Sequence, residues 1–196
     1  MTTGFGTNEL LDCYRRGIFP MSDGRQDNSI FLLDPAMRGI IPLDGLHVSK
    51  SLAKFVRNTT YEVTFNKAFP QVIKACALTR NETWISEGIE YLYTELFLQG
   101  DAHSVEVWDG EQLIGGLYGV TQGGGFFGES MFSLATNASK LALVKLVERL
   151  NARGFTLLDT QFLTDHLKTL GAVEIPQAEY KARLASALEV EAAFHP

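Results

Sequence analysis

Two glycine-containing turns divide the middle of the chain into three strand-like segments. The segments are 103–108, 113–120 and 126–132, and the turns are Asp109-Gly110 and Gly123-Gly124-Gly125. Apolar and polar residues alternate in the first segment, and Asp-Gly between two such segments is a strong hairpin signal. We therefore expect three consecutive antiparallel strands at the centre of the fold.

The segments after these strands predict an α+β domain. Asn137 is a favourable N-cap for a helix over 138–151, which carries one apolar stripe and which Gly154 ends. The remaining expected elements are a buried strand over 156–162, a short helix over 165–170, a strand over 172–175 and a helix over 177–190. This order of strands and helices resembles the N-acetyltransferase-like (GNAT-type) fold.

The first part of the chain predicts a small N-terminal α/β subdomain. Within residues 1–65 the expected helices cover 7–17 and 47–56, and the expected strands cover 38–43 and 61–65. Helices over 68–78 and 87–99 are expected after them. We expect the small subdomain at residues 1–65 and the acetyltransferase-like catalytic domain at residues 66–196.

Composition and cysteine spacing exclude several classes of protein. No apolar run approaches the roughly 18 residues of a membrane span, and the first residues lack the basic start and apolar centre of a signal peptide. Cys13 and Cys76 stand far apart, and the four histidines lack metal-ligand spacing. We expect a cytoplasmic protein that binds neither a membrane nor a metal ion.

The formal net charge of −6 is unevenly distributed. Residues 1–80 contain ten Lys and Arg against seven Asp and Glu, whereas residues 81–196 contain seven against sixteen. The basic part could meet phosphates and the acidic part a cationic partner. Charged surfaces that contact only solvent would give the same counts of charged residues.

Asp159 and Gln161 stand out in the otherwise apolar strand expected over 156–162. Side chains two positions apart in a strand share a face, so the carboxylate and the amide should point the same way. The spacing fits a buried carboxylate that polarises an amide beside an incoming nucleophile. It fits equally well a polar pair that the backbone satisfies at a strand end.

Glu129 and Met131 share one face of the third expected strand. A carboxylate beside a thioether suits a ligand with a cationic head and an apolar body. An exposed glutamate in a hairpin gives the same pattern, so the two interpretations remain open.

The glycines at 123–125 also have two interpretations. A glycine-rich loop before a helix N-terminus can bind the pyrophosphate of a coenzyme A-type ligand through main-chain amides. Strand-like residues follow these glycines, so the sequence favours a plain hairpin.

Several short motifs occur in order along the chain. They are 14–21 (YRRGIFPM), Asp34-Pro35 with Arg38, 83–85 (TWI), 102–108, 115–120 (GGLYGV), 128–133 (GESMFS), 137–140 (NASK), 158–161 (LDTQ) and 170–176 (LGAVEIP). Together, from about residue 8 to residue 184, these motifs resemble the leucyl/phenylalanyl-tRNA–protein transferase family.

The resemblance implies an aminoacyltransferase without a cofactor. It would move Leu, Phe or sometimes Met from aminoacyl-tRNA to the α-amino group of proteins that begin with Arg or Lys, which marks them for degradation in the N-degron pathway. By motif, Asp159 and Gln161 are the catalytic pair, and Glu129 lies with them at the acceptor's amino terminus. The residues implied for the apolar amino-acid pocket are Met131, Phe126, Leu117 and Leu143.

The resemblance also implies how the tRNA is held. Trp84 matches an aromatic residue that stacks on the terminal adenine, and the partner position, commonly tryptophan, is Met21. Stacking energies of roughly 1–3 kcal/mol per base should therefore be reduced. The residues expected to hold acceptor-stem phosphates are Arg15, Arg16, Lys50, Lys54 and Arg57.

In the mechanism that we expect, Gln161 is polarised by Asp159 and accepts a hydrogen bond from the acceptor amine. Glu129 orients the cationic N-terminus, and the ribose hydroxyl of the tRNA leaves. Two other classes of function remain open, namely a coenzyme A-dependent N-acetyltransferase and a non-enzymatic module that binds basic N-termini.

Overall fold

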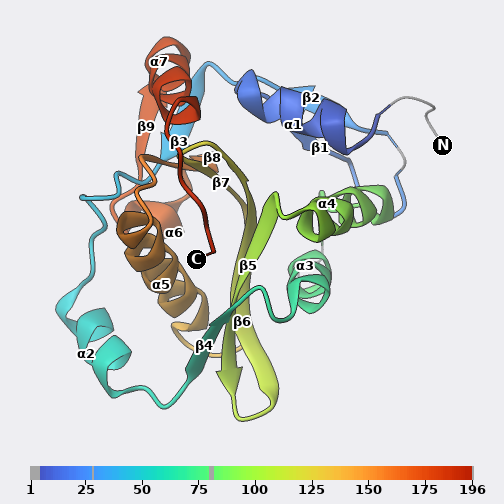
Figure 1. Cartoon of the computed structure of the whole chain (residues 1–196). Coiled ribbons are helices and arrows are strands. Elements are labelled where there is room, and N and C mark those ends of the chain that lie inside the picture. Colours follow the sequence, from blue (N-terminus) through green and yellow to red (C-terminus); the bar gives the residue numbers. More distant parts are fainter. Residues whose placement is uncertain (1–4, 28, 80–81, 196) are drawn as a thin grey trace.

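A seven-stranded mixed sheet runs through the centre of the computed structural model, which describes residues 5–27, 29–79 and 82–195 (Figure 1). Residues 1–4 lie outside the described residues. They belong to the N-terminal segment that the sequence predicts not to be a signal peptide. The strand order is β4-β5-β6-β7-β8-β3-β9, and β1 pairs with β2 separately.

The described residues form mixed α and β structure. The strands are β1 (Phe19–Met21), β2 (Phe31–Leu33), β3 (Met37–Ile40), β4 (Glu62–Phe65), β5 (Ala102–Asp109), β6 (Gln112–Gln122), β7 (Gly125–Ser133), β8 (Leu157–Gln161) and β9 (Val173–Pro176). The helices are α1 (Thr7–Arg15), α2 (Lys50–Asn58), α3 (Phe69–Leu78), α4 (Glu87–Gln99), α5 (Ala138–Ala152), α6 (Asp165–Lys168) and α7 (Gln177–Leu188).

The three antiparallel strands predicted from the glycine turns are confirmed, because β6 pairs antiparallel with both β5 and β7. Gly110 and Gly123 have φ angles of +57° and +54°, which glycine adopts without steric cost. The Gly124 N–H donates to the Ala187 carbonyl at 2.7 Å. The second turn is therefore a plain hairpin that rests on the end of α7, and the pyrophosphate interpretation of its glycines is wrong.

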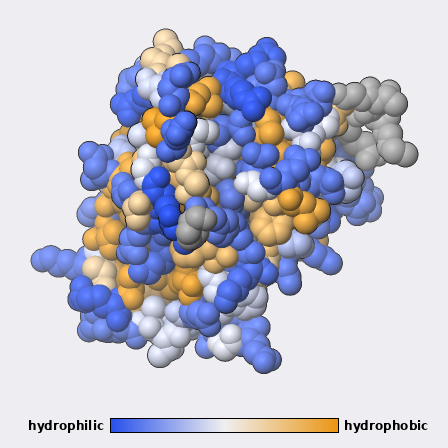
Figure 2. Space-filling view, in the orientation of Figure 1, coloured by the Kyte–Doolittle hydropathy of each residue, from blue (hydrophilic) through white to orange (hydrophobic). Residues whose placement is uncertain are grey.

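Helices cover both faces of the sheet (Figure 1). On one face, α5 buries Leu141, Leu146 and Leu150 in a core cluster that also contains Leu158 of β8. The opposite face carries α1, α3, α4 and α7, whose buried side chains form a second cluster. The surface seen from the same side is mostly hydrophilic, with apolar side chains gathered over α5 and around α3 and α4 (Figure 2).

Two strands from the first part of the chain belong to the central sheet. β3 pairs antiparallel with β8 and β9, and β4 pairs antiparallel with β5. The division of the chain at residue 65 stays a prediction. A Cβ at Gly39 would lie only 2.7 Å from the Phe162 carbonyl carbon, so glycine allows β3 to pass close to the end of β8.

The parallel strands β7 and β8 pair only at their starts. Their register joins Gly125 to Leu157, Phe126 to Leu158 and Phe127 to Asp159, and it ends there. The residues that follow on each strand line a cavity. The separation of these two neighbouring strands therefore opens the sheet into a cavity.

Two local features differ from the sequence expectations. Asn137 occupies the N-cap position of α5 as predicted, but its φ is +65° and its side chain makes no capping hydrogen bond. β2 forms where no strand was expected, and its Phe31 and Leu32 side chains are about half exposed. Ser49 does cap α2, because its hydroxyl accepts the Leu52 N–H at 3.2 Å.

Candidate active site

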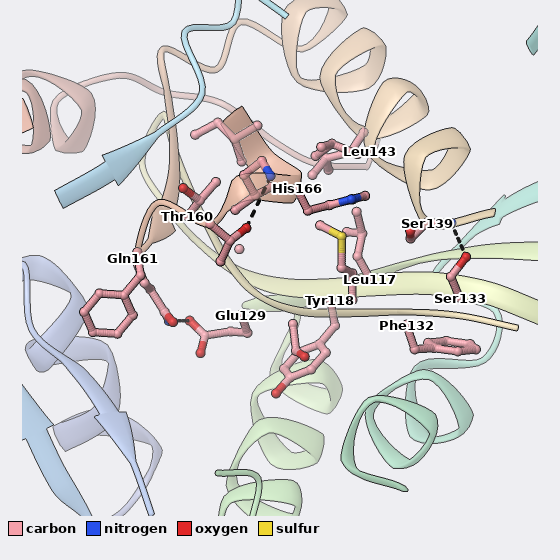
Figure 3. Close-up of a pocket in the computed structure, with 18 of the residues that line it drawn as sticks. Leu117, Tyr118, Glu129, Phe132, Ser133, Ser139, Leu143, Thr160, Gln161 and His166 are labelled. Carbon is pink, nitrogen blue, oxygen red and sulfur yellow. Dashed lines mark hydrogen bonds between the residues drawn. The ribbon is translucent and has the colours of Figure 1, made fainter. Parts of the chain in front are cut away.

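A cavity of about 690 Å³ opens where β7 and β8 separate (Figure 3). Its apolar side chains are Leu117, Met131, Leu143, Leu146 and Leu158. Its polar lining includes Glu129, Ser130, Thr160 and Gln161. Glu129 and Gln161 lie together on one side, and Leu117 and Leu143 lie on the other. The cavity thus combines an apolar compartment with a carboxylate and an amide.

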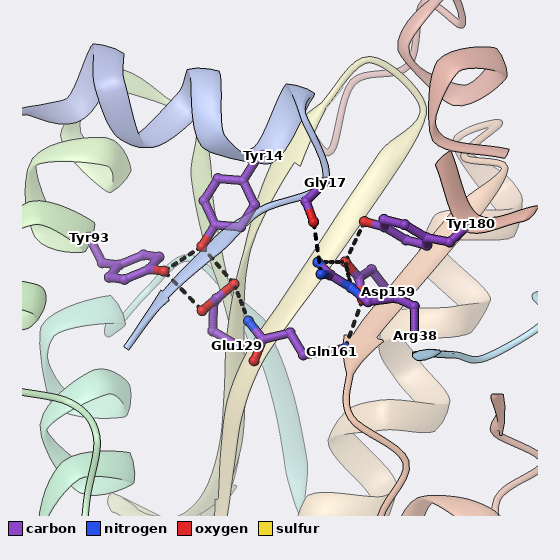
Figure 4. Close-up of polar contacts among 8 residues, drawn as sticks. All are labelled: Tyr14, Gly17, Arg38, Tyr93, Glu129, Asp159, Gln161 and Tyr180. Carbon is purple, nitrogen blue, oxygen red and sulfur yellow. Dashed lines mark hydrogen bonds and ion pairs between the residues drawn. The ribbon is translucent and has the colours of Figure 1, made fainter. Parts of the chain in front are cut away.

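Glu129 is held by three hydrogen-bond donors (Figure 4). Tyr14 Oη donates to Oε1 at 2.7 Å, and Tyr93 Oη donates to Oε2 at 2.9 Å. Gln161 Nε2 donates to Oε1 at 2.9 Å, and the two tyrosine hydroxyls contact each other. Burial raises the pKa of Glu129 to about 7, against the opposing effect of these hydrogen bonds. The carboxyl group can therefore exchange a proton near neutral pH.

Asp159 is fully buried and is not among the residues that line the cavity. Arg38 donates to its carboxylate through Nη2 at 2.6 Å and through Nε at 3.0 Å, and Tyr180 Oη donates at 2.7 Å. The Arg38 guanidinium, which is 1% exposed, also donates to the Gly17 carbonyl at 2.9 Å. Asp159 is therefore one half of a buried ion pair that ties β8 to β3 and α7.

Gln161 connects the two carboxylates. Its main-chain N–H donates to Asp159 Oδ1 at 2.7 Å, while its side-chain amide reaches Glu129. Gln161 has a φ of +63°, in the left-handed region that residues with side chains rarely adopt. The chain leaves the regular strand geometry at this point, so Gln161 enters the cavity although Asp159 does not.

The contact between Asp159 and Gln161 differs from the sequence prediction. The strand alternation predicts a carboxylate beside the side-chain amide, but Asp159 accepts the main-chain N–H of Gln161. The carboxylate that contacts the side-chain amide is Glu129. Glu129 is therefore better placed than Asp159 to exchange a proton with a ligand in the cavity.

Comparison with known proteins decides the family. Residues 40–185 match the family model described as leucyl/phenylalanyl-tRNA protein transferase. A leucyl/phenylalanyl-tRNA–protein transferase of Maricaulis maris is 57% identical, covering 97% of this chain and 90% of that protein. One of Phenylobacterium zucineum is 55% identical, covering 97% and 88%. The chain belongs to the leucyl/phenylalanyl-tRNA–protein transferase family. It is an aminoacyltransferase.

A solved structure, that of L-PGS from Bacillus licheniformis, shows a distant likeness to this transferase. The TM-score is 0.41 at 14% identity, over 82% of this chain and 55% of that one.

The predicted amino-acid pocket of the transferase comes together only in part. Leu117, Met131 and Leu143 line the cavity, whereas Phe126 does not. The Phe126 ring is fully buried and packs against Phe194, with 5.7 Å between the ring centroids. Phe126 is thus a core residue in this structure, which differs from the expected pocket role.

The two positions expected around the terminal adenine lie on adjacent segments. Trp84 lines the cavity, and Met21 does not. Ser22, the next residue after Met21, donates its N–H to the Trp84 carbonyl at 3.3 Å and its hydroxyl to the same oxygen at 3.0 Å. These bonds hold the segment that contains Met21 beside the segment that contains Trp84.

The predicted phosphate-binding residues of the transferase are exposed but divided between two places. Arg15 and Arg16 lie at the end of α1, and Lys50, Lys54 and Arg57 lie on α2. The two helices lie at different ends of the molecule (Figure 1). The fold thus presents two basic groups and does not gather the five side chains at one site.

Four residues around the two carboxylates have no role that the sequence pattern predicts. They are Tyr14, Arg38, Tyr93 and Tyr180. Tyr14 and Arg38 occur within the motifs shared with the family, which was the only available signal. Within the described part of the transferase, no helix has the length and apolar character to cross a bilayer.

Proposed function

We propose that this transferase moves Leu, Phe or Met from aminoacyl-tRNA to the α-amino group of proteins that begin with Arg or Lys. The observation that carries the proposal is the pairing of Glu129 and Gln161 at the polar side of an apolar cavity. The catalytic domain has an acetyltransferase-like fold in this proposal. Two features support that fold. Strands β5, β6 and β7 form an antiparallel meander, and the parallel strands β7 and β8 separate after Phe127 and Asp159.

The apolar compartment receives the side chain of the donor amino acid. Leu117, Met131 and Leu143 offer it aliphatic and thioether surface without a charged group. A methylene difference in such a pocket changes the binding free energy by about 1–3 kcal/mol, so discrimination among Leu, Phe and Met is modest. Trp84 at the cavity stacks on the terminal adenine, with Met21 on the neighbouring segment.

Glu129 and Gln161 receive the acceptor. The free α-amino group has a pKa of roughly 7.7–8.0 and is mostly protonated at neutral pH, so it must lose a proton before it attacks. Glu129, whose pKa is raised to about 7, takes that proton. Gln161 holds the amine beside the ester, and Asp159 positions Gln161 through its main-chain N–H.

The reaction exchanges an ester for an amide. The acceptor nitrogen attacks the ester carbonyl carbon, the new C–N bond forms and the bond to the ribose oxygen breaks. The ammonium proton that Glu129 accepts first is released to solvent. Glu129 then takes the second proton, which the attacking nitrogen loses as the amide forms, and passes it to the departing ribose oxygen. Aminoacyl-tRNA is already activated, so no ATP and no cofactor take part. Holding both substrates in register supplies much of the rate.

The products explain the cellular role that we propose. A protein that receives Leu or Phe at its N-terminus enters the N-degron pathway for degradation, and the reaction takes place in the cytoplasm, where aminoacyl-tRNA is available. A reporter protein that begins with Arg should therefore have a shorter half-life in cells that contain this transferase than in cells that lack it.

The direct test mixes labelled Leu-tRNA with a peptide that begins with Arg. Label should appear on the peptide with the wild-type protein and fall by about 10²-fold or more with Gln161→Ala and with Glu129→Gln. Lys145→Ala, an α5 change outside the cavity, is the matched control and should retain transfer. Acetylation of the peptide from acetyl-coenzyme A, or peptide binding without transfer, would instead support the two rival functions.

A further inference from the structure

Trp84 lies on a segment that has neither helical nor strand structure. This segment, residues 82–86, directly precedes α4, and the Trp84 side chain is half-buried and lines the cavity. The ring packs in part against the core cluster of the α1, α3 and α4 face. The place of its exposed part therefore depends on where the main chain of this segment lies.

The loop 22–27 holds that main chain through two of its residues. Ser22, which is 5% exposed, donates its N–H at 3.3 Å and its hydroxyl at 3.0 Å to the Trp84 carbonyl. Arg25 Nη1 donates to the Ile85 carbonyl at 3.3 Å, and the Glu87 N–H donates to the Arg25 carbonyl at 3.1 Å. The loop thus fixes the chain from the indole to the start of α4.

Arg25 also ties the segment to α4. Its Nη2 forms an ion pair with Glu90 Oε2 on that helix, and the two side chains are only 26% and 23% exposed. Solvent screens such a partly buried pair much less than an exposed one. The same guanidinium therefore connects the Ile85 carbonyl with the Glu90 carboxylate, and lysine has no planar fork that reproduces both contacts.

We propose that Ser22, Arg25 and Glu90 are positioning residues for the donor, which hold the Trp84 ring where it stacks on the terminal adenine of aminoacyl-tRNA. The inference rests on the proposed function, which gives Trp84 that role. Met21, the expected partner in stacking, has no aromatic ring, so the affinity for the adenine depends on Trp84. A small displacement of its segment should then weaken donor binding.

A direct contact between the Arg25 guanidinium and a tRNA phosphate is the alternative. A donor analogue without any phosphate separates the two explanations. With such an analogue, only the positioning of Trp84 predicts that Arg25→Met weakens binding.

The test measures, by calorimetry, the dissociation constant of 3′-deoxy-3′-leucylamino-adenosine, an amide analogue of the donor terminus without a phosphate. Trp84→Ala should weaken binding by about 5- to 150-fold, as expected for the loss of one base stack. Arg25→Met and Glu90→Gln should each weaken it several-fold, and Arg25→Lys should weaken it less than Arg25→Met. Ser22→Ala should have a smaller effect, because the main-chain N–H still donates to Trp84.

A double-variant cycle shows whether Arg25 acts through Trp84. In the Trp84→Ala background, Arg25→Met should cause no further loss of affinity, because the ring that Arg25 positions is absent. With Leu-tRNA as donor, Arg25→Met should raise KM and leave kcat near the wild-type value. The matched control is Arg183→Met, which removes an ion pair with Glu179 on α7 and should bind the analogue as the wild-type protein does. Thermal unfolding checks that each variant is folded.

Several results would overturn the positioning role and leave the transfer reaction intact. They are a wild-type protein that transfers Leu from Leu-tRNA but does not bind the analogue, and a dissociation constant that neither Trp84→Ala nor Arg25→Met changes. An equal loss from Arg25→Met with and without the Trp84 ring would mean that Arg25 acts by itself. A loss seen with Leu-tRNA but not with the analogue would assign Arg25 to a phosphate. A wild-type protein that moves no label from Leu-tRNA to a peptide beginning with Arg overturns the proposed function instead.

Discussion

Asp159 and Gln161 are joined through the main chain, with the Gln161 N–H 2.7 Å from Asp159 Oδ1, whereas the Gln161 side chain donates to Glu129. The two carboxylates therefore have separate tasks. Asp159 is fully buried against Arg38 and fixes the end of β8, and Glu129 faces the cavity beside Gln161. Loss of either carboxylate should lower activity, but only the loss of Asp159 should also break a buried ion pair.

The ion pair between Arg38 and Asp159 predicts a large effect on stability. Removing one partner leaves the other charge buried and uncompensated, which typically costs about 3–5 kcal/mol. Arg38→Met and Asp159→Asn should each lower the free energy of unfolding by an amount of this order. The double variant should lose clearly less than the sum of the two, because it leaves no unpaired charge. Urea unfolding measures all three values.

An additive double variant would contradict the ion-pair argument. Lys181→Met is a useful control, since its ammonium pairs with Asp34 at 2.6 Å while being 41% exposed. Exposed pairs contribute about 0–1 kcal/mol, so this variant should change the free energy of unfolding little.

The raised pKa of Glu129 predicts how stability depends on pH. The folded protein holds the Glu129 proton up to a pH of about 7, whereas the unfolded chain releases it near 4.5. Between these values the folded state binds more protons, so the Glu129 contribution to stability falls as the pH rises, by at most about 1.4 kcal/mol per pH unit. It is constant outside this window.

Glu129→Gln cannot ionise and should lack this contribution. The free energy of unfolding of Glu129→Gln minus that of the wild-type protein should therefore increase from pH 4.5 to about 7 and then level off. Urea unfolding of both proteins across this window gives the difference. A difference that does not change with pH would show that the pKa of Glu129 is not raised.

Tyr93 offers a second way to move the same pKa. Its hydroxyl donates to Glu129 Oε2 at 2.9 Å, and this hydrogen bond lowers the pKa of the carboxyl group. Tyr93→Phe should therefore raise the pKa of Glu129 above its wild-type value. The rise of the transfer rate with pH should shift to higher pH, because Glu129 must be ionised to accept the proton.

Tyr91→Phe is the matched control for that shift. Tyr91 lies on the same helix, α4, but its side chain is 64% exposed. The pH profile of Tyr91→Phe should coincide with the wild-type profile. A Tyr93→Phe profile that also coincides with it would argue against Glu129 as the proton acceptor.

Local sequence signals predicted most of the fold, and long-range contacts set most of the site. The glycine turns and alternating residues correctly predicted β5, β6 and β7, because hairpin geometry depends on neighbouring residues. The same alternation failed at Gln161, where the φ of +63° ends the regular strand. The partners of the carboxylates could not be predicted either: Tyr14 lies 115 residues from Glu129, and Arg38 lies 121 residues from Asp159.

The residues predicted for the amino-acid pocket show the same limit of prediction from local sequence. Met131 lines the cavity as predicted, since it follows Glu129 by two positions on β7 beyond the last residue that pairs with β8. Phe126, on the paired part of the same strand, is covered by Phe194 from the end of the chain. No local sequence pattern predicts that a segment more than sixty residues later in the chain covers the Phe126 ring.

Leu143 sets the size of the donor pocket and predicts a change in donor preference. Its side chain is 3% exposed and lines the cavity from α5, so Leu143→Ala should enlarge the apolar compartment. The ratio of kcat/KM for Phe-tRNA to that for Leu-tRNA should rise, by up to the roughly 10–200-fold that 1–3 kcal/mol allows. The free energy of unfolding should also fall by about 2–5 kcal/mol, as for other buried leucines.

Leu150→Ala separates the two effects, because Leu150 is fully buried on the same helix but does not line the cavity. It should lower stability similarly and leave the donor ratio unchanged; an equal change of ratio in both variants would mean that loosened packing, and not pocket size, controls donor choice.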